Sequence, residues 1–375
     1  MMGMARRQML TVALVLLAIA GIVLTSVGFA TDANPEPTDF SLFGPAGELL
    51  LRGQWAEVFS DPTVQAGPFE LAFWGIPHLL AVSGSVGWAV FFIVASSVGA
   101  VVVAIVVRRP LAELDSDWWV PLAAGLVALL SVVGTLTKSV AEGHPAQLAI
   151  PVLWVLAARL SRGGAPVAAA AVLACSAGWE LWGLLGVPVL MLAPRLSVRL
   201  AATSLAAVFT VVVAIYLPFV LVGPFPMFGF SWPISEGSLT HLLWPDATAF
   251  SWPLRLAQGV IVLVAAAAVA RATYRSVDGI WLTPLAVCAV RLLTDPVLAS
   301  YYSIAPEVLI CVGIAFAAAR RTLAALLLGL VMLNLAIDVR PITVLTTALL
   351  VATVAVAVVL VRRETQKKSG LGVEA

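Results

Sequence analysis

Apolar runs of about 20 residues recur along the chain, and each is long enough to cross a bilayer as a helix. Hydrophobic residues make up 61% of the 375 residues and charged residues only 11%, so most of the chain requires lipid as its solvent. Runs such as LTVALVLLAIAGIVL are continuously apolar, whereas the strands of a membrane β-barrel alternate apolar and polar residues. The sequence therefore predicts an all-α, polytopic bundle of transmembrane helices, with residues 1–375 as a single integral membrane domain.

Glycine, proline and charged residues separate the apolar runs and predict about twelve spans, with ten as the lower bound. The fifth and sixth of these are short, and the sequence GWELWG between them is expected to turn at the membrane interface. The predicted spans are residues 9–29, 88–107, 118–137, 145–160, 165–180, 182–193, 198–222, 253–270, 279–298, 303–319, 322–337 and 341–361.

The basic residues lie at alternate connections between these spans. With the N-terminus inside, 16 of the 21 Lys and Arg residues fall on the cytoplasmic side, which is a strong positive-inside bias. We therefore expect a multi-pass protein of the plasma membrane with both termini in the cytoplasm, residues 362–375 forming the C-terminal tail. The cytoplasmic connections are short, and the chain has no phosphate-binding glycine motif, which argues against a nucleotide-binding domain.

Two long polar loops are expected on the extracytoplasmic face, at residues 31–70 and 223–252. The first holds seven of the twenty acidic residues, so it is the first place to look for chemistry. Apolar residues at helical spacing within 42–52 and 55–59 predict juxtamembrane helices that lie on the membrane surface. Residues 71–80 are expected to form a further re-entrant or juxtamembrane piece.

The start of the first loop resembles a known family. The sequence TDFSLF at 38–43, followed by GELLLRG at 47–53, is similar to the pattern of actinobacterial mannosyltransferases that use polyprenyl-phosphate mannose. These belong to the C-type glycosyltransferases, membrane enzymes with a long outer first loop. The resemblance implies transfer of a sugar, with mannose expected, from a polyprenyl-phosphate donor to a lipid or cell-envelope glycan at the extracytoplasmic face. The partners implied are this donor, this acceptor and the bilayer, with no nucleic acid.

Transfer from a sugar phosphate needs a carboxylate to take the proton of the attacking hydroxyl. Asp39 is the predicted catalytic base of an inverting transfer, and Asp32 is the competing candidate. From its position alone, Asp39 is more typical of a helix N-cap or a solvated loop residue, and it is the motif resemblance that favours the catalytic role. The phosphodiester is already activated, so no organic cofactor is required. No pair of histidines has metal-ligand spacing, so no dedicated metal site is predicted, and a divalent cation on the donor phosphate is left open.

The departing phosphate needs cations or hydrogen-bond donors. Arg291 is the main candidate, because guanidinium binds phosphate through two parallel hydrogen bonds, and Tyr301 or Tyr302 would donate nearby. The structural alternative for Arg291 is an ion pair with Asp295, four residues later. Further outer-face candidates for substrate binding are Lys138, His144 and His241. Helix capping is the alternative for His144, and interfacial packing is the alternative for His241.

A second function class is a transporter or flippase for a lipid or cell-wall precursor, or a catalytically silent member of the same scaffold. Transporters typically carry repeated halves, or charges near the bilayer midplane beside broken helices. The sequence shows no repeat, and its ionisable residues collect at the outer ends of spans, which favours the enzyme. The oligomeric state is not indicated by any feature of the sequence.

Overall fold

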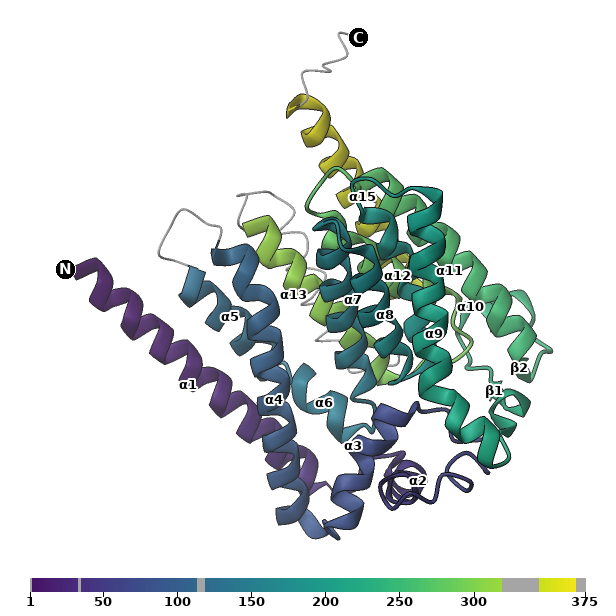
Figure 1. Cartoon of the computed structure of the whole chain (residues 1–375). Coiled ribbons are helices and arrows are strands. Elements are labelled where there is room, and N and C mark those ends of the chain that lie inside the picture. The colour runs from purple at the N-terminus through teal and green to yellow at the C-terminus, as the bar shows by residue number, and fades with distance from the viewer. Residues whose placement is uncertain (1, 33–34, 113–118, 319–343, 369–375) are drawn as a thin grey trace.

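The computed structural model describes residues 2–32, 35–112, 119–318 and 344–368, and helices dominate this part of the chain (Figure 1). In chain order the elements are α1 (Met2–Thr31), α2 (Phe40–Leu51), α3 (Pro68–Leu79), α4 (Gly84–Ala112), α5 (Trp119–Val132), α6 (Thr135–Ala141), α7 (Ala146–Arg162), α8 (Pro166–Ala177), the 3-10 helix η1 (Leu181–Leu192), α9 (Val198–Val222), η2 (Pro226–Gly229), β1 (Ser231–Pro233), α10 (Leu239–Leu243), β2 (Ala249–Ser251), α11 (Trp252–Thr273), α12 (Gly279–Thr294), η3 (Ser300–Ser303), α13 (Ile304–Ala318) and α15 (Val344–Lys368).

Six helical stretches in the described residues are long and apolar enough to cross a membrane, or seven if α5 and α6, which meet at a 44° bend, form one span. This confirms an all-α, multi-pass membrane protein but not a count of twelve. The predicted spans 165–180 and 182–193 are only 12-residue elements, α8 and η1. At its α-helical rise α8 covers roughly 18 Å, and the 3-10 helix η1 covers roughly 24 Å, so both are shorter than a bilayer core of about 30 Å. The predicted span 322–337 lies outside the described residues.

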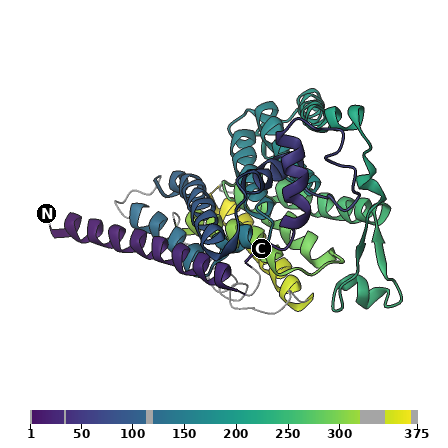
Figure 2. The same cartoon turned by 90° about the horizontal axis from the view of Figure 1, so that it is seen from below.

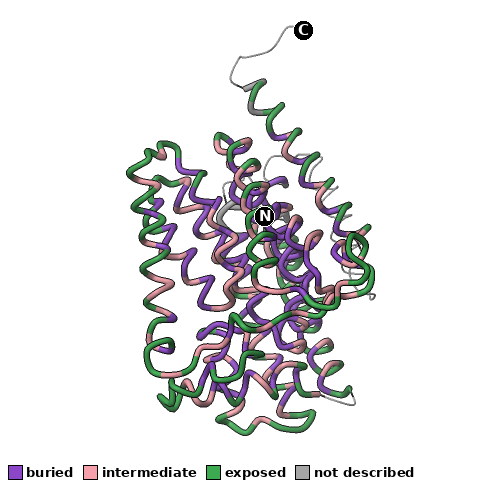
Figure 3. The backbone as a smooth tube through the Cα atoms, turned by 90° about the vertical axis from the view of Figure 1, so that its right-hand side faces the viewer, coloured by how far each residue is buried: buried purple, intermediate pink, exposed green. Residues whose placement is uncertain are grey.

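The shorter helix α12 lies inside the bundle. The 16-residue helix α12 is buried along most of its length and packs against α7, α11, α13, α15 and η1. Helices α1, α4, α9, α11 and α15 instead carry many exposed apolar side chains along their outer faces. Figure 3 shows this as a buried interior within a largely exposed periphery. Such outer faces suit a lipid environment, in which exposed apolar side chains carry no hydration cost.

Helix α2 in the first long loop and helix α3, which begins at the end of that loop, cross at very close range. A Cβ atom added to Gly47 of α2 would lie 2.0 Å from the Leu71 carbonyl oxygen of α3, and one added to Gly75 of α3 would lie 2.5 Å from the Gly47 backbone. Only glycine permits this approach, because any side chain would separate the two backbones. The predicted helix at 42–52 is confirmed as α2, and the piece at 71–80 is α3. The packing fixes the N-terminal ends of both helices, where Asp39 and Glu70 lie.

Residues 55–59, predicted to be helical, form turns instead. Val58 and Phe59 are buried there, and Phe59 packs against Phe219 and Phe225, so packing with α9 and the second loop decides the conformation of this segment. The second loop contains a short antiparallel ribbon in which Trp232 pairs with Phe250. This ribbon lies at the opposite edge of the molecule from α1 in both views (Figures 1 and 2).

Several connecting segments gather toward the two ends of the bundle. Segments α2, α3, α6 and the ribbon lie toward one end, and the C-terminal part of α15 lies toward the other (Figure 1). At the latter end, Arg162 donates to the backbone carbonyls of Tyr274 and Arg275, joining two connections predicted to be cytoplasmic. The end that carries α2 and α3 holds the predicted site residues.

Candidate functional site

Asp39 immediately precedes α2 and lies against the turn between α6 and α7. Its Oδ2 atom is 2.8 Å from His144 Nε2, and 36% of its side chain is exposed. Gly143 has φ +86°, and a Cβ atom there would lie 3.2 Å from the Asp39 backbone nitrogen. A left-handed glycine with no side chain therefore allows this turn to reach Asp39. No side-chain hydrogen bond from Asp39 caps α2, so its carboxylate is free of the capping role considered from the sequence.

His144 is held in one orientation by its neighbours. Its ring stacks on Tyr301 with centroids 3.7 Å apart, and the edge of Phe43 meets it at an interplanar angle of 84°. The buried Trp74 indole donates to the Gly143 carbonyl at 3.1 Å, which ties α3 to the same turn. Only a tenth of the His144 side chain is exposed, so its two ring nitrogens face fixed partners.

Two further carboxylates complete what we call the carboxylate cluster, formed by Asp39, Glu70, His144 and Glu180. His144 Nδ1 lies 3.9 Å from Glu180 Oε1, and ligating atoms of Glu70, His144 and Glu180 all lie within 4.8 Å of one another. Backbone hydrogen bonds explain why Glu70 meets Glu180: Gly67 donates to the Trp179 carbonyl and Phe69 donates to the Gly178 carbonyl, at 2.6 and 2.8 Å. Exposure falls from 36% at Asp39 to 18% at Glu180 and 0% at Glu70.

The charges of the cluster perturb its members strongly. Burial alone would lower the pKa of His144, but the carboxylates of Asp39 and Glu180 more than offset this and raise the pKa to about 10. The imidazolium form therefore prevails at neutral pH. Burial, followed by the nearby charge of Glu180, raises the pKa of Glu70 well above its usual range. The cluster thus strongly attracts protons or other cations.

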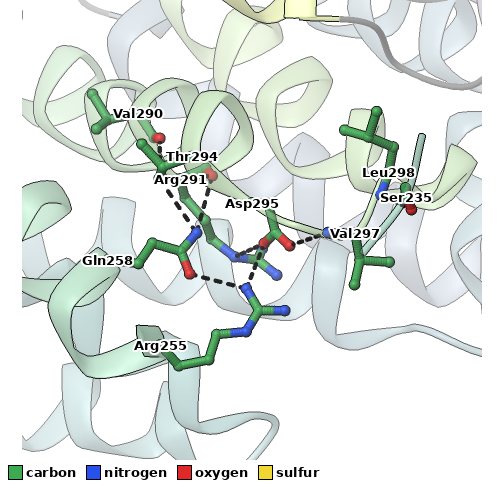
Figure 4. A network of polar contacts seen from close by, with 9 residues as sticks. All are labelled: Ser235, Arg255, Gln258, Val290, Arg291, Thr294, Asp295, Val297 and Leu298. Atoms are coloured by element: carbon green, nitrogen blue, oxygen red, sulfur yellow. Dashed lines mark hydrogen bonds and ion pairs between the residues drawn. The ribbon is translucent and has the colours of Figure 1, made fainter. Parts of the chain in front are cut away.

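A second group of polar residues, which we call the arginine network, comprises Arg255, Gln258, Arg291 and Asp295 (Figure 4). Asp295 is fully buried, and its Oδ2 atom lies 3.0 Å from Arg255 Nη1 and 3.6 Å from Arg291 Nε. Gln258 accepts from Arg255 and donates to the Arg291 carbonyl. The pairing of Arg291 with Asp295 considered from the sequence is therefore present, but a second guanidinium shares the same carboxylate.

Aromatic rings enclose both arginines and connect the two groups. Arg291 lies over Trp182 at 4.1 Å and over Tyr302 at 4.9 Å, and Arg255 lies over Trp232 at 4.5 Å. Tyr302 contacts Tyr301 edge-on at 4.8 Å, and Tyr301 stacks on His144. Tyr301 and Tyr302 therefore form what we call the aromatic wall, which contacts the carboxylate cluster at one end and the arginine network at the other.

The remaining predicted residues differ in their placement. Lys138 donates to the Ser300 carbonyl at 2.8 Å, which links α6 to the segment just before Tyr301. The backbone N–H of His241 donates to the Ser238 hydroxyl at the start of α10. Within the described residues, its ring makes no hydrogen bond or ion pair with the carboxylate cluster. Asp32 is exposed. The structure thus brings Asp39, His144, Tyr301, Tyr302 and Arg291 together and leaves His241 and Asp32 apart.

Sequence reasoning did not single out Glu70, Glu180 or Arg255 as site residues. Each carboxylate had a readable signal, because Glu70 in GPFELAFW and Glu180 in GWELWG are single acids within apolar and aromatic stretches. A lone acid in such surroundings is unusual unless it has a partner elsewhere in the fold. Arg255 carried a weaker signal at the start of a predicted span.

Comparison with known proteins adds no relative: no family model, curated protein or solved structure matches this chain.

Proposed function

We propose that this protein is a polyprenyl-phosphate-dependent glycosyltransferase, a hexosyltransferase with mannose as the expected sugar, acting on a lipid or glycan acceptor at the extracytoplasmic face. The observation that carries the proposal is the contact of Asp39 with His144 at one end of an aromatic wall whose other end holds two arginines. In this proposal Asp39 serves as the base and the two arginines serve as the phosphate-binding group. The motif resemblance of residues 38–53 supplies the reaction class.

In the proposed reaction the acceptor hydroxyl attacks the anomeric carbon of the sugar. The new C–O bond forms as the bond to the phosphate oxygen breaks, and the electron pair leaves with polyprenyl phosphate. One oxygen of Asp39 is held by His144, and the partly exposed carboxylate takes the hydroxyl proton. A single displacement of this kind inverts the anomeric configuration.

The arginine network would stabilise the departing phosphate. Arg255 and Arg291 share one carboxylate, so the network carries one positive charge in excess. A guanidinium offers phosphate paired hydrogen bonds, and its low exposure strengthens the attraction. Tyr302, which contacts Arg291, is placed to donate a further hydrogen bond.

Replacing Asp39 with Asn tests the base. Asn keeps the shape of the side chain but cannot take the proton, so transfer should slow by roughly 10² to 10⁴ fold with donor binding largely unchanged. The assay is transfer from a radiolabelled polyprenyl-phosphate sugar in membranes matched for protein amount, with Asp32→Asn as the control. Near-normal activity of Asp39→Asn eliminates the assignment, and loss in Asp32→Asn alone moves the base seven residues upstream.

The sidedness of the proposal is tested separately. With both termini in the cytoplasm, reporter fusions after Arg275 and Arg363 should read cytoplasmic. Fusions within residues 35–65 and 225–248 should read extracytoplasmic. An extracytoplasmic reading after Arg275 would place the carboxylate cluster on the wrong side for this donor.

A further inference from the structure

Three potential metal ligands from distant parts of the chain converge in the carboxylate cluster. Glu70 comes from the first turn of α3, His144 from the turn before α7, and Glu180 from the extended residue before η1. Their ligating atoms lie within 4.8 Å of one another. Two ligands of one zinc ion stand about 3.4 Å apart at a tetrahedral angle, given bonds of about 2.0–2.1 Å, so small side-chain movements would close the set around an ion.

The two nitrogens of His144 face different partners. Nδ1 faces Glu180, and Nε2 faces Asp39 at 2.8 Å. Metal-bound histidines typically donate their second ring N–H to a carboxylate, which fixes the ring and makes the first nitrogen a better ligand. Asp39 Oδ2 is close enough to Nε2 for this role, but the ring N–H is not aligned with it for a hydrogen bond in this structure. Stacking on Tyr301 holds the ring plane.

Glu70 gives an independent indication that a ligand belongs here. Its side chain is 0% exposed, its Oε2 atom has no hydrogen-bond partner among the described residues, and Oε1 has only the Ala146 N–H at 3.5 Å. A buried carboxylate without a partner is costly. Because Glu180 is close by, a cation between the two carboxylates would satisfy both.

The geometry points to a binding site for one divalent transition-metal ion of the zinc or manganese type, with Glu70, Glu180 and His144 Nδ1 as ligands and Asp39 positioning His144. One imidazole nitrogen with carboxylate oxygens suits these ions better than Mg²⁺ or Ca²⁺, which favour all-oxygen sites. The site stands independently of the proposed transfer reaction, because it rests on these side chains alone.

The test is metal binding by the full-length protein in lipid nanodiscs after chelator treatment. Zn²⁺ binding is measured by titration calorimetry, and Mn²⁺ binding by loss of the free-ion paramagnetic signal. Glu70→Gln and Glu180→Gln remove a ligand charge with little change of shape, and Glu57→Gln makes the same change at an exposed site in the same loop. We expect one ion per chain in the wild type and in Glu57→Gln, and at least a tenfold loss of affinity in the two cluster variants.

Absence of a stoichiometric site in the wild type, or unchanged affinity in both cluster variants, would overturn the proposal. Tighter binding of Mg²⁺ than of Zn²⁺ and Mn²⁺ would overturn the assigned metal class. If Glu70→Gln does not fold, Glu180→Gln carries the test, since Glu180 is the more exposed ligand.

Asp39→Asn examines the positioning role and separates this proposal from the catalytic one. Loss of a carboxylate that orients a ligand typically costs 10–100-fold in metal affinity, and we expect a loss in that range. Unchanged affinity in Asp39→Asn would remove the positioning role. Transfer measured at saturating metal then reports only on the base, so a failed base assignment leaves the metal site intact, and the reverse also holds.

Discussion

The carboxylate cluster and the arginine network are built with opposite charge balances. The cluster surrounds one histidine with three carboxylates, whereas the network surrounds one buried carboxylate with two guanidinium groups. Each group therefore has an unbalanced charge. The cluster has an excess of negative charge that would attract a cation, and the network has an excess of positive charge that would attract an anion. An excess charge held at low exposure is expensive for folding alone, so the pair is better explained by ligands than by stability.

The largest stability effect that this comparison predicts is at Asp295. Asp295→Asn leaves the contact to the Val297 N–H possible but removes the carboxylate that Arg255 and Arg291 share. Removing one partner from a buried ion pair typically costs about 3–5 kcal/mol, because the remaining charge is left uncompensated. Thermal unfolding in nanodiscs should show a clearly lower midpoint.

The matched change in the cluster is Glu70→Gln. It removes a buried carboxylate that lies close to the carboxylate of Glu180, so the metal-free protein should be as stable as the wild type or more stable. A fall in the midpoint as large as that of Asp295→Asn would show that Glu70 is a compensated structural charge, and the contrast between the two regions would fail.

The next largest effect is expected in the arginine network, which is proposed to bind the donor phosphate. Arg291→Lys keeps the charge near Asp295 but loses the planar pair of donors, so use of the polyprenyl-phosphate donor should fall. A hydrogen bond to a charged group contributes about 1.5–3 kcal/mol, which corresponds to roughly tenfold or more in kcat/KM for the donor. Folded protein is confirmed by its unfolding midpoint, and equal donor use by the Lys variant would remove the bidentate role.

The sequence predicted the class of fold because that depends on local composition. Continuous apolar runs indicated helices in lipid, and the loop around Asp39 was identified as the first place for chemistry. The number of spans was harder to predict, since α8 and η1 are apolar enough to be spans but too short to cross a bilayer. Tertiary packing also determined the conformation of residues 55–59. Their apolar residues have helical spacing, but burial of Phe59 holds the segment in turns.

The sites depended on contacts between segments far apart in the chain. Metal-ligand spacing, as read in a sequence, finds only ligands on one short segment, whereas Glu70, His144 and Glu180 come from three. Backbone hydrogen bonds between residues 67–69 and 178–179 bring Glu70 and Glu180 together, and the sequence of neither segment indicates this pairing. Arg291 was found because an arginine within a predicted span is conspicuous, but Arg255 joined it only through folding.

The smallest expected effect lies at Tyr301, which connects the two regions. Its ring stacks on His144 and meets Tyr302 edge-on. Aromatic pairs contribute about 0.5–1.5 kcal/mol beyond the area they bury, so Tyr301→Leu should slow transfer by roughly two- to tenfold by loosening His144. Tyr301→Phe keeps the ring and should act like the wild type in the same radiolabel assay. If Tyr301→Phe is as slow as Tyr301→Leu, the hydroxyl rather than the stack is what matters, and Tyr301 would then belong with Tyr302 among the groups that donate to the phosphate.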